Sequence, residues 1–211
     1  MHRVALVMFV LLSAVQADAQ IVRPRFQLSS PSAWVSAGLG LQNAFTVRDG
    51  ETGSSWQFGS ATPIGVSIEK AFASGITAGI RGSTTQASLR YEGAATTYAA
   101  DARVSQLLGS IRLASGQGFH TVLELNAGVT YFSEFRTQDQ ETRLAPMSGD
   151  QDFTFSFGYG FGYSFNNRFS VDAVQDVTTM VHQKNGLSPS DDASNRVGST
   201  RIVARIGLGS R

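Results

Sequence analysis

Two histidines are the first candidates for acid–base chemistry in this chain. His182 follows Asp176 closely in the sequence, with Thr residues between them, so a base, a carboxylate and a hydroxyl could form a hydrolytic set. His120 sits in a short polar stretch, and neither histidine has a nucleophile elbow or metal-type spacing beside it. Because catalytic sets depend on several groups acting together, we predict no catalytic residue, metal site or cofactor, and no enzyme.

Glycine-rich and acidic stretches give no stronger chemical signal. The letters "GYGFG" around Gly160 lie inside an alternating segment and do not open a helix, as a phosphate-binding loop must. The acids of segments 139–150 and 191–192 lack the spacing of a calcium loop. A formal net charge of +1 argues against a nucleic-acid partner.

The segment "FTFSFGYGFGYSF" indicates how the chain positions its side chains. Large aromatic residues alternate there with Gly, Ser and Thr, and period two means an extended strand with two unlike faces. We predict that the aromatic face contacts lipid, through Phe153, Phe155, Phe157, Tyr159, Phe161, Tyr163 and Phe165.

The same alternation recurs along the chain and predicts an all-β protein. We expect eight strands near 34–41, 64–69, 76–81, 107–113, 123–132, 153–165, 169–174 and 201–208. The fourth changes phase between Val104 and Leu107, which predicts a bulge near Ser105 or Gln106.

The connections between these strands alternate in length. Short turns fall at 73–75, 115–118 and 166–168, whereas long polar segments fall at 42–55, 85–97, 137–151 and 183–197. All short turns therefore lie at one end with both termini. This layout is typical of an antiparallel up-and-down transmembrane barrel with periplasmic turns and four external loops.

The N-terminus has the three parts of a cleaved signal peptide. A basic start, an apolar core and the small-residue site "ADA" fill residues 1–19. We expect a periplasmic lead-in at 20–32 and the barrel at 33–211. The chain has no cysteine, so disulfides play no part.

Aromatic residues flank the short turns, where an interfacial belt is expected. The predicted periplasmic belt consists of Phe72, Phe119, Phe165 and Phe169.

Charged residues of both signs occupy positions predicted to face the lumen. They are Glu69, Arg81, Arg112, Glu124, Glu134, Asp172, Asp176, Arg201 and Arg205. An eight-stranded barrel is just wide enough for its own side chains, which favours a packed structural network of Arg–carboxylate pairs. The alternative is a narrow charged pathway for small solutes.

The chain resembles the small eight-stranded outer-membrane barrels of the OmpA/OmpX type, on its signal peptide, alternating strands, loop asymmetry and aromatic belts. The resemblance implies a location in the outer membrane of a Gram-negative-type bacterium, in contact with lipid and lipopolysaccharide. It also implies a structural or surface-interaction role, with a possible extracellular partner at the long loops.

Three other functions remain open from the sequence. They are a narrow porin-like channel, a lipid-modifying enzyme at the rim, and a secreted soluble carrier of a lipophilic ligand. The carrier would need the aromatic face turned inward.

Overall fold

The computed structural model describes residues 30–48, 54–93, 97–137, 150–182 and 194–210. The expected signal peptide at 1–19, and the lead-in up to residue 29, lie outside these ranges. Within the described ranges, no helix is sufficiently long and apolar to span a membrane.

Ten strands make up the described chain. They are β1 (Ala33–Gln42), β2 (Phe45–Arg48), β3 (Ser55–Phe58), β4 (Ile64–Ala73), β5 (Ile76–Glu92), β6 (Thr97–Gln117), β7 (Phe119–Thr137), β8 (Asp150–Asn166), β9 (Phe169–Val181) and β10 (Ser194–Leu208).

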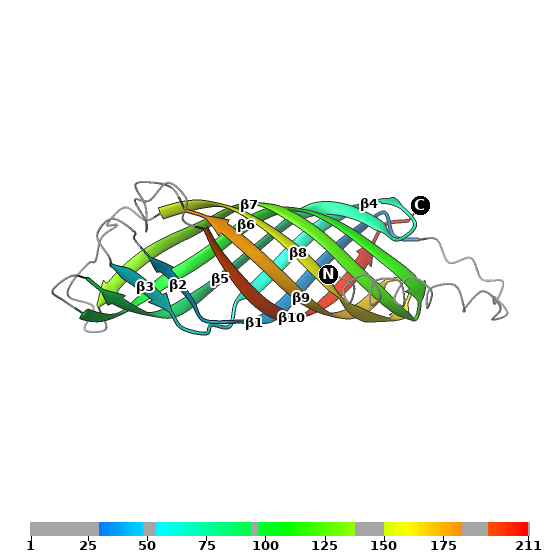
Figure 1. Ribbon diagram of the computed structural model, residues 1–211. Coiled ribbons are helices and arrows are strands. Elements are labelled where there is room, and N and C mark those ends of the chain that lie inside the picture. Colours follow the sequence, from blue (N-terminus) through cyan, green and yellow to red (C-terminus); the bar gives the residue numbers. More distant parts are fainter. Residues whose placement is uncertain (1–29, 49–53, 94–96, 138–149, 183–193, 211) are drawn as a thin grey trace, which may run out of the picture.

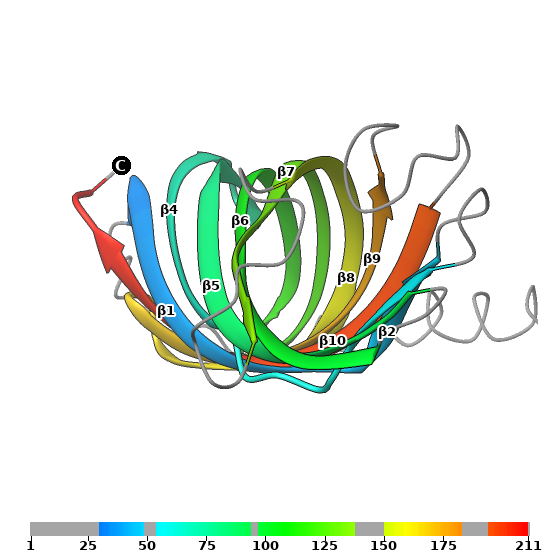
Figure 2. The same cartoon turned by 90° about the vertical axis from the view of Figure 1, so that its left-hand side faces the viewer.

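Eight of these ten strands close into a ring (Figures 1 and 2). The order is β5-β4-β1-β10-β9-β8-β7-β6, and β6 pairs back onto β5. All pairings are antiparallel, including that of the first strand with the last, where Ala33 lies opposite Leu208. The predicted eight-stranded antiparallel barrel is confirmed. The two extra strands, β2 and β3, form a hairpin that pairs with β5 beyond the end of β4.

The two ends of the barrel differ as the connection lengths predict. The tight connections β4–β5, β6–β7 and β8–β9 lie at the end where the chain terminates, which is on the right in Figure 1. The β2–β3 hairpin lies at the opposite end.

One stretch of the barrel wall is apolar on its outside. The seven predicted aromatics of β8 all point outward, with 45% to 60% of each side chain exposed. Phe72, Phe119 and Phe165 are likewise exposed beside the short turns, and Phe169 stacks on Phe165 with ring centroids 5.3 Å apart. Because a closed ring pairs its backbone groups internally, such a wall can face lipid.

Toward the long-loop end, the polarity of the wall inverts. Along the outside of β5, Ile76 and Ile80 give way to Thr84, Gln86 and Arg90. On its inside, Thr77 and Arg81 give way to Ala87 and Leu89, which are buried. The expected polar loop at 85–97 is therefore wrong for much of its length, because β5 continues to Glu92. Beyond the lipid band, water lies outside the wall and the apolar side chains turn inward.

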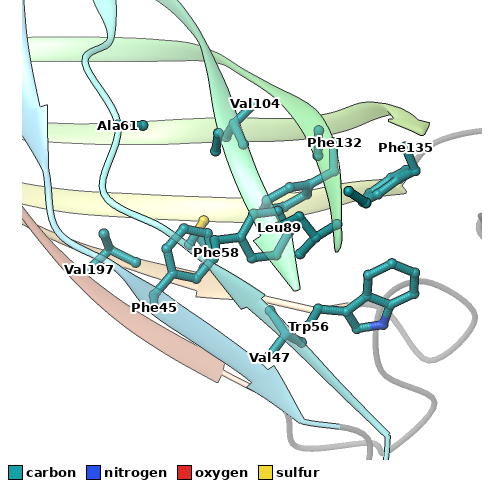
Figure 3. Packing of buried hydrophobic residues seen from close by; sticks show 14 residues of the cluster. Phe45, Val47, Trp56, Phe58, Ala61, Leu89, Val104, Phe132, Phe135 and Val197 are labelled. Carbon is teal, nitrogen blue, oxygen red and sulfur yellow. The ribbon is translucent and has the colours of Figure 1, made fainter. Parts of the chain in front are cut away.

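The inward-turned side chains form a hydrophobic cap over the lumen (Figure 3). Phe45 of β2 stacks on Phe58 of β3 at 4.6 Å between ring centroids, and Phe58 lies 5.4 Å from Phe132 of β7. Trp56 contacts Tyr91 and Phe135 at 4.5 and 5.4 Å. The cap comprises Phe45, Val47, Trp56, Phe58, Ala61, Ala87, Leu89, Ala100, Ala102, Val104, Phe132, Phe135, Met180 and Val197.

The predicted bulge near Ser105 or Gln106 is wrong. Val104 points inward into the cap and Leu107 points outward to the apolar wall, so β6 alternates without a break. The apparent phase change arises because apolar residues face inward at the external end of β6 and outward along its lipid-facing part. The register shift lies nearer the external end of the β6–β7 pair, where Glu134 of β7 has a φ of 54°.

We predict that Phe132→Ala loosens the external end of the barrel. Phe132 is fully buried at the centre of the cap, and emptying such a site costs about 3 to 5 kcal/mol. Limited proteolysis of the folded protein should cut the external segments faster, while the barrel keeps its heat-dependent gel shift. Unchanged cleavage would contradict a cap that holds this end together. Phe153→Ala, on the outer face, is the matched control.

Candidate functional site

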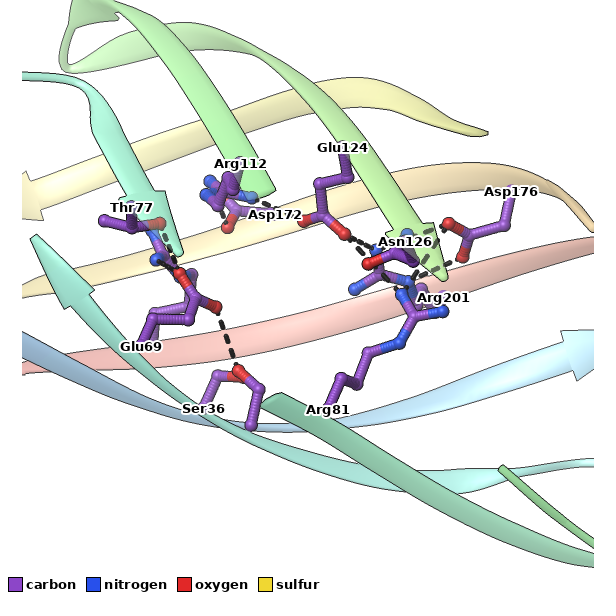
Figure 4. A network of polar contacts seen from close by, with 12 residues as sticks. Ser36, Glu69, Thr77, Arg81, Arg112, Glu124, Asn126, Asp172, Asp176 and Arg201 are labelled. Carbon is purple, nitrogen blue, oxygen red and sulfur yellow. Dashed lines mark hydrogen bonds and ion pairs between the residues drawn. The ribbon is translucent and has the colours of Figure 1, made fainter. Parts of the chain in front are cut away.

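Eight of the nine predicted lumen charges lie inside the barrel wall (Figure 4). They come from β4, β5, β6, β7, β9 and β10, since period two turns every second residue of each strand inward. The eight are Glu69, Arg81, Arg112, Glu124, Asp172, Asp176, Arg201 and Arg205.

Glu124 is the centre of the larger group of contacts. Its Oε1 accepts a hydrogen bond from Arg112 Nη1 at 2.9 Å, and its Oε2 accepts one from Arg201. Arg81 Nη1 lies 3.5 Å from Glu124 Oε2 and 3.7 Å from Asp176 Oδ1. Arg201 Nε also donates to Asp176 at 2.6 Å, so one ionic network joins β5, β6, β7, β9 and β10.

Asp172 extends this network toward the short-turn end and brings in His120. Arg112 Nη2 donates to Asp172 Oδ2 at 2.8 Å, and His120 Nε2 lies 2.8 Å from Asp172 Oδ1. His120 Nδ1 faces the Gly118 carbonyl at 3.0 Å and Ser164 Oγ at 3.3 Å. This role is not predicted above, although His120 is an even number of residues from inward-facing Glu124 on β7 and so faces the same side.

Glu69 and Arg205 form a second buried group. Arg205 Nη2 and Thr77 Oγ1 each donate to Glu69 Oε2 at 2.5 Å, and Ser67 Oγ donates to Oε1 at 2.9 Å. The Arg205 guanidinium also lies 4.7 Å from the centre of the Trp34 ring. Glu69 is thus satisfied by three donors from three strands.

Within this set of eight residues, the opposite charges balance in number. The eight residues supply four guanidinium groups and four carboxylates, and every carboxylate contacts at least one guanidinium. Burying a charge without a partner costs several kcal/mol, so each side of the network requires the other. The arrangement binds strands together and leaves no surplus charge to attract ions.

Glycines on β8 make room for this network. A Cβ at Gly158 would lie 2.6 Å from Asp176 Oδ1, and one at Gly162 would lie 1.9 Å from Asp172 Oδ1 and 2.5 Å from His120 Nε2. The sequence predicts space for long Arg side chains from across the lumen. The structure instead gives the space to carboxylates of the adjacent strand and to His120.

The prediction that Glu134 faces the lumen is wrong. Parity along β7 places it inside, but the irregularity there shifts the alternation, so that Phe135 turns inward and Glu134 outward. Its side chain is 48% exposed and pairs with Arg103 Nη1 at 2.9 Å on the outside of the barrel.

His182 is buried and does not contact Asp176. Its Nδ1 pairs with Asp152 of β8, and both side chains are fully buried; the ring of cap residue Phe132 lies 6.3 Å from the His182 ring, centroid to centroid. Asp176 bonds Arg201 instead. The hydrolytic set considered for His182 and Asp176 therefore does not assemble.

A small cavity of about 70 Å³ separates the ionic network from the cap. Arg81, Asp176 and Arg201 lie on its network side, and Met180 and Val197 on its cap side. The surrounding wall includes Ser, Thr and Gly residues. Within the described chain, no group of three or more His, Asp or Glu residues is placed to hold a metal ion.

A closed antiparallel ring, an apolar outer band and a charged, filled interior define a transmembrane β-barrel of the outer-membrane class. No protein-family model matches the sequence, and no curated protein matches it.

The fold is similar to that of solved structures. Neisserial surface protein A (NspA) superimposes with a TM-score of 0.57 at 11% identity, over 85% of this chain and 99% of that one. OprG from Pseudomonas aeruginosa gives a TM-score of 0.47 at 14% identity, covering 85% and 95%. Ail from Yersinia pestis gives 0.47 at 16%, covering 84% and 99%. The likeness to NspA therefore supports, for the fold, the resemblance to small outer-membrane barrels.

We predict that Glu124→Gln strongly destabilises the barrel. The change leaves Arg112, Arg201 and Arg81 short of one negative charge in a buried place, and breaking such a group costs about 3 to 5 kcal/mol. Unfolding by urea, followed by the loss of the heat-dependent gel shift, should move to lower denaturant. Glu134→Gln, at the exposed pair, should cost less than about 1 kcal/mol. Equal losses of stability in the two variants would show that the buried network stabilises the barrel no more than an exposed ion pair does.

A second prediction concerns the space left by β8. Gly162→Ala places a methyl group against Asp172 and His120, so the Arg112–Asp172 contact must shift and the midpoint of unfolding should fall. Gly109→Ala is the matched control, because its Cβ meets its nearest atom at an ordinary 3.6 Å. The same urea series measures both, and a tolerated Gly162→Ala would contradict a tightly packed network.

Proposed function

We propose that this protein is a structural or surface-interaction barrel in the outer membrane of a Gram-negative-type bacterium, with a lumen that does not conduct. The observation that carries the proposal is the double closure of the lumen. A charge-balanced network fills the membrane level, and a hydrophobic cap covers it.

The closure argues against the narrow-channel alternative. A solute on this path would have to separate buried ion pairs and pass through an aromatic cluster. Both steps carry large free-energy costs, because neither the charges nor the rings gain a substitute partner. The cavity between the two layers has a volume of only about 70 Å³.

Partners would meet the external end of the barrel. Outside the cap, the wall carries exposed arginines above the lipid band, namely Arg48, Arg90, Arg103, Arg136 and Arg196. Guanidinium groups bind phosphate bidentately, which suits contact with the lipopolysaccharide headgroup. The cap holds these strands as a rigid platform, from which the long connections can reach an extracellular partner. NspA, the neighbour of like fold, is itself called a surface protein.

The other two alternatives lose their support. A rim enzyme would require an accessible histidine, whereas His182 is buried and His120 pairs with Asp172. We therefore propose that the protein is not an enzyme. A soluble carrier would require the β8 aromatics inside, and the structure places them outside.

The test measures both the cellular location of the protein and its conductance in a bilayer. The precursor expressed in a Gram-negative host should appear in the washed outer-membrane fraction as a band that migrates faster without boiling. The purified barrel should then give no steady ohmic conductance in a planar bilayer. The triple variant Arg81→Ala/Arg201→Ala/Phe132→Ala, which removes two guanidinium groups from the network and one ring from the cap, should leak. A steady pore in the wild-type protein would overturn the closed lumen, and a soluble, unshifted protein would overturn the barrel.

A further inference from the structure

The lipid-facing wall carries one polar pair in its middle. Gln175 of β9 and Thr200 of β10 lie opposite each other, and Thr200 Oγ1 donates to Gln175 Oε1 at 2.5 Å. Their neighbours in the pairing are Tyr159 on one side and Leu41 on the other. Along β9, outward Ala173 lies below Gln175 and Val177 above it.

This pair leaves hydrogen-bonding capacity exposed to lipid. Among the described residues, the Gln175 amide nitrogen makes a single long bond, 3.4 Å to the Asp176 carbonyl, so one of its N–H groups has no partner. The Thr200 hydroxyl, already a donor, can still accept. Polar groups that face hydrocarbon without partners are costly, and they favour association between membrane segments.

The wall around the pair has a self-complementary profile. On one side, Phe157, Tyr159 and Phe161 form a row of large outward side chains on β8, here called the aromatic ridge. On the other side lies a row of small outward residues, here called the low strip. The low strip comprises Val171 of β9, Ala204 of β10 and Ala37 of β1, which lie opposite one another in the register, and Ala173 of β9, which lies opposite Ile202. Figure 1 shows β8, β9, β10 and β1 side by side on this part of the wall.

We propose that this face binds a second copy of the chain across a two-fold axis near Gln175. In this arrangement the aromatic ridge of each copy packs on the low strip of the other. The free amide N–H of each Gln175 donates to Thr200 of its neighbour, so one patch supplies both donor and acceptor. A two-fold interface requires such self-complementarity, because the same surface occurs on both sides.

The first test uses the absence of native cysteine in the chain. Single variants Val177→Cys and Ile80→Cys place a thiol on this face and on the β5 face, both on outward positions. In native outer membranes, mild oxidation should cross-link Val177→Cys to a dimer of the chain and leave Ile80→Cys monomeric. The heat-dependent gel shift reports that both variants fold.

The second test removes the polar pair without changing its bulk. Gln175→Leu/Thr200→Val should lower dimer affinity in lipid vesicles roughly tenfold, measured by energy transfer between labelled copies. Thr84→Val/Ser105→Ala is the matched control, since it removes another outward hydroxyl pair, 2.9 Å apart, near the level where polarity inverts. This control should leave dimer affinity unchanged.

Three results would overturn the proposal. They are a wild-type protein that stays monomeric in vesicles, equal cross-linking from β9 and β5, and equal losses of affinity in the two double variants. The first would mean that lipid alone covers the face, and the second that contact between copies is random.

Discussion

Every other feature of this structure depends on the pairing of β1 with β10. In hydrocarbon no water is present to satisfy a backbone N–H or carbonyl, so an open edge would leave a row of unpaired groups along the sheet. The first and last strands meet along the full length of β1, from Ala33 opposite Leu208 to Gln42 opposite Ser199. This closure permits an apolar outer wall, and it also creates an interior that lipid cannot fill.

The narrowness of that interior determines its chemistry. Side chains from facing strands meet across the lumen, so a charge on one strand finds its counter-ion on another, as Glu124 does with Arg112, Arg81 and Arg201. Equal numbers of both signs make the filling neutral. Glycines on β8 make this packing possible, because the carboxylates and His120 occupy the volume that a side chain at these positions would fill.

Much of the barrel follows from the sequence, since period two and turn length are local properties of the chain. They predict eight strands, the outward aromatics of β8 and most of the lumen charges. Two kinds of information are not local. Parity places Glu134 inside, but an irregularity in β7 turns it outward. The burial of His182 depends on the change from lipid to water around the wall, which reverses the face on which apolar residues belong. In the sequence, such a boundary between lipid and water cannot be told from a break in the strand. Val104 and Leu107 therefore look like a change of phase, although the strand alternates regularly.

The inversion of polarity along the wall gives the molecule a direction. Above the lipid-facing part of the wall, the outside carries charged side chains such as Arg90, Arg103 and Glu134. At the same level, the aromatic rings of the cap pack in the interior. Those segments can cross a bilayer only before the cap forms, as an unfolded chain. Once the rings have packed, return would require charged groups to pass through hydrocarbon in a folded wall. The cap therefore favours the inserted state, because withdrawal from the membrane would first require its packed rings to separate.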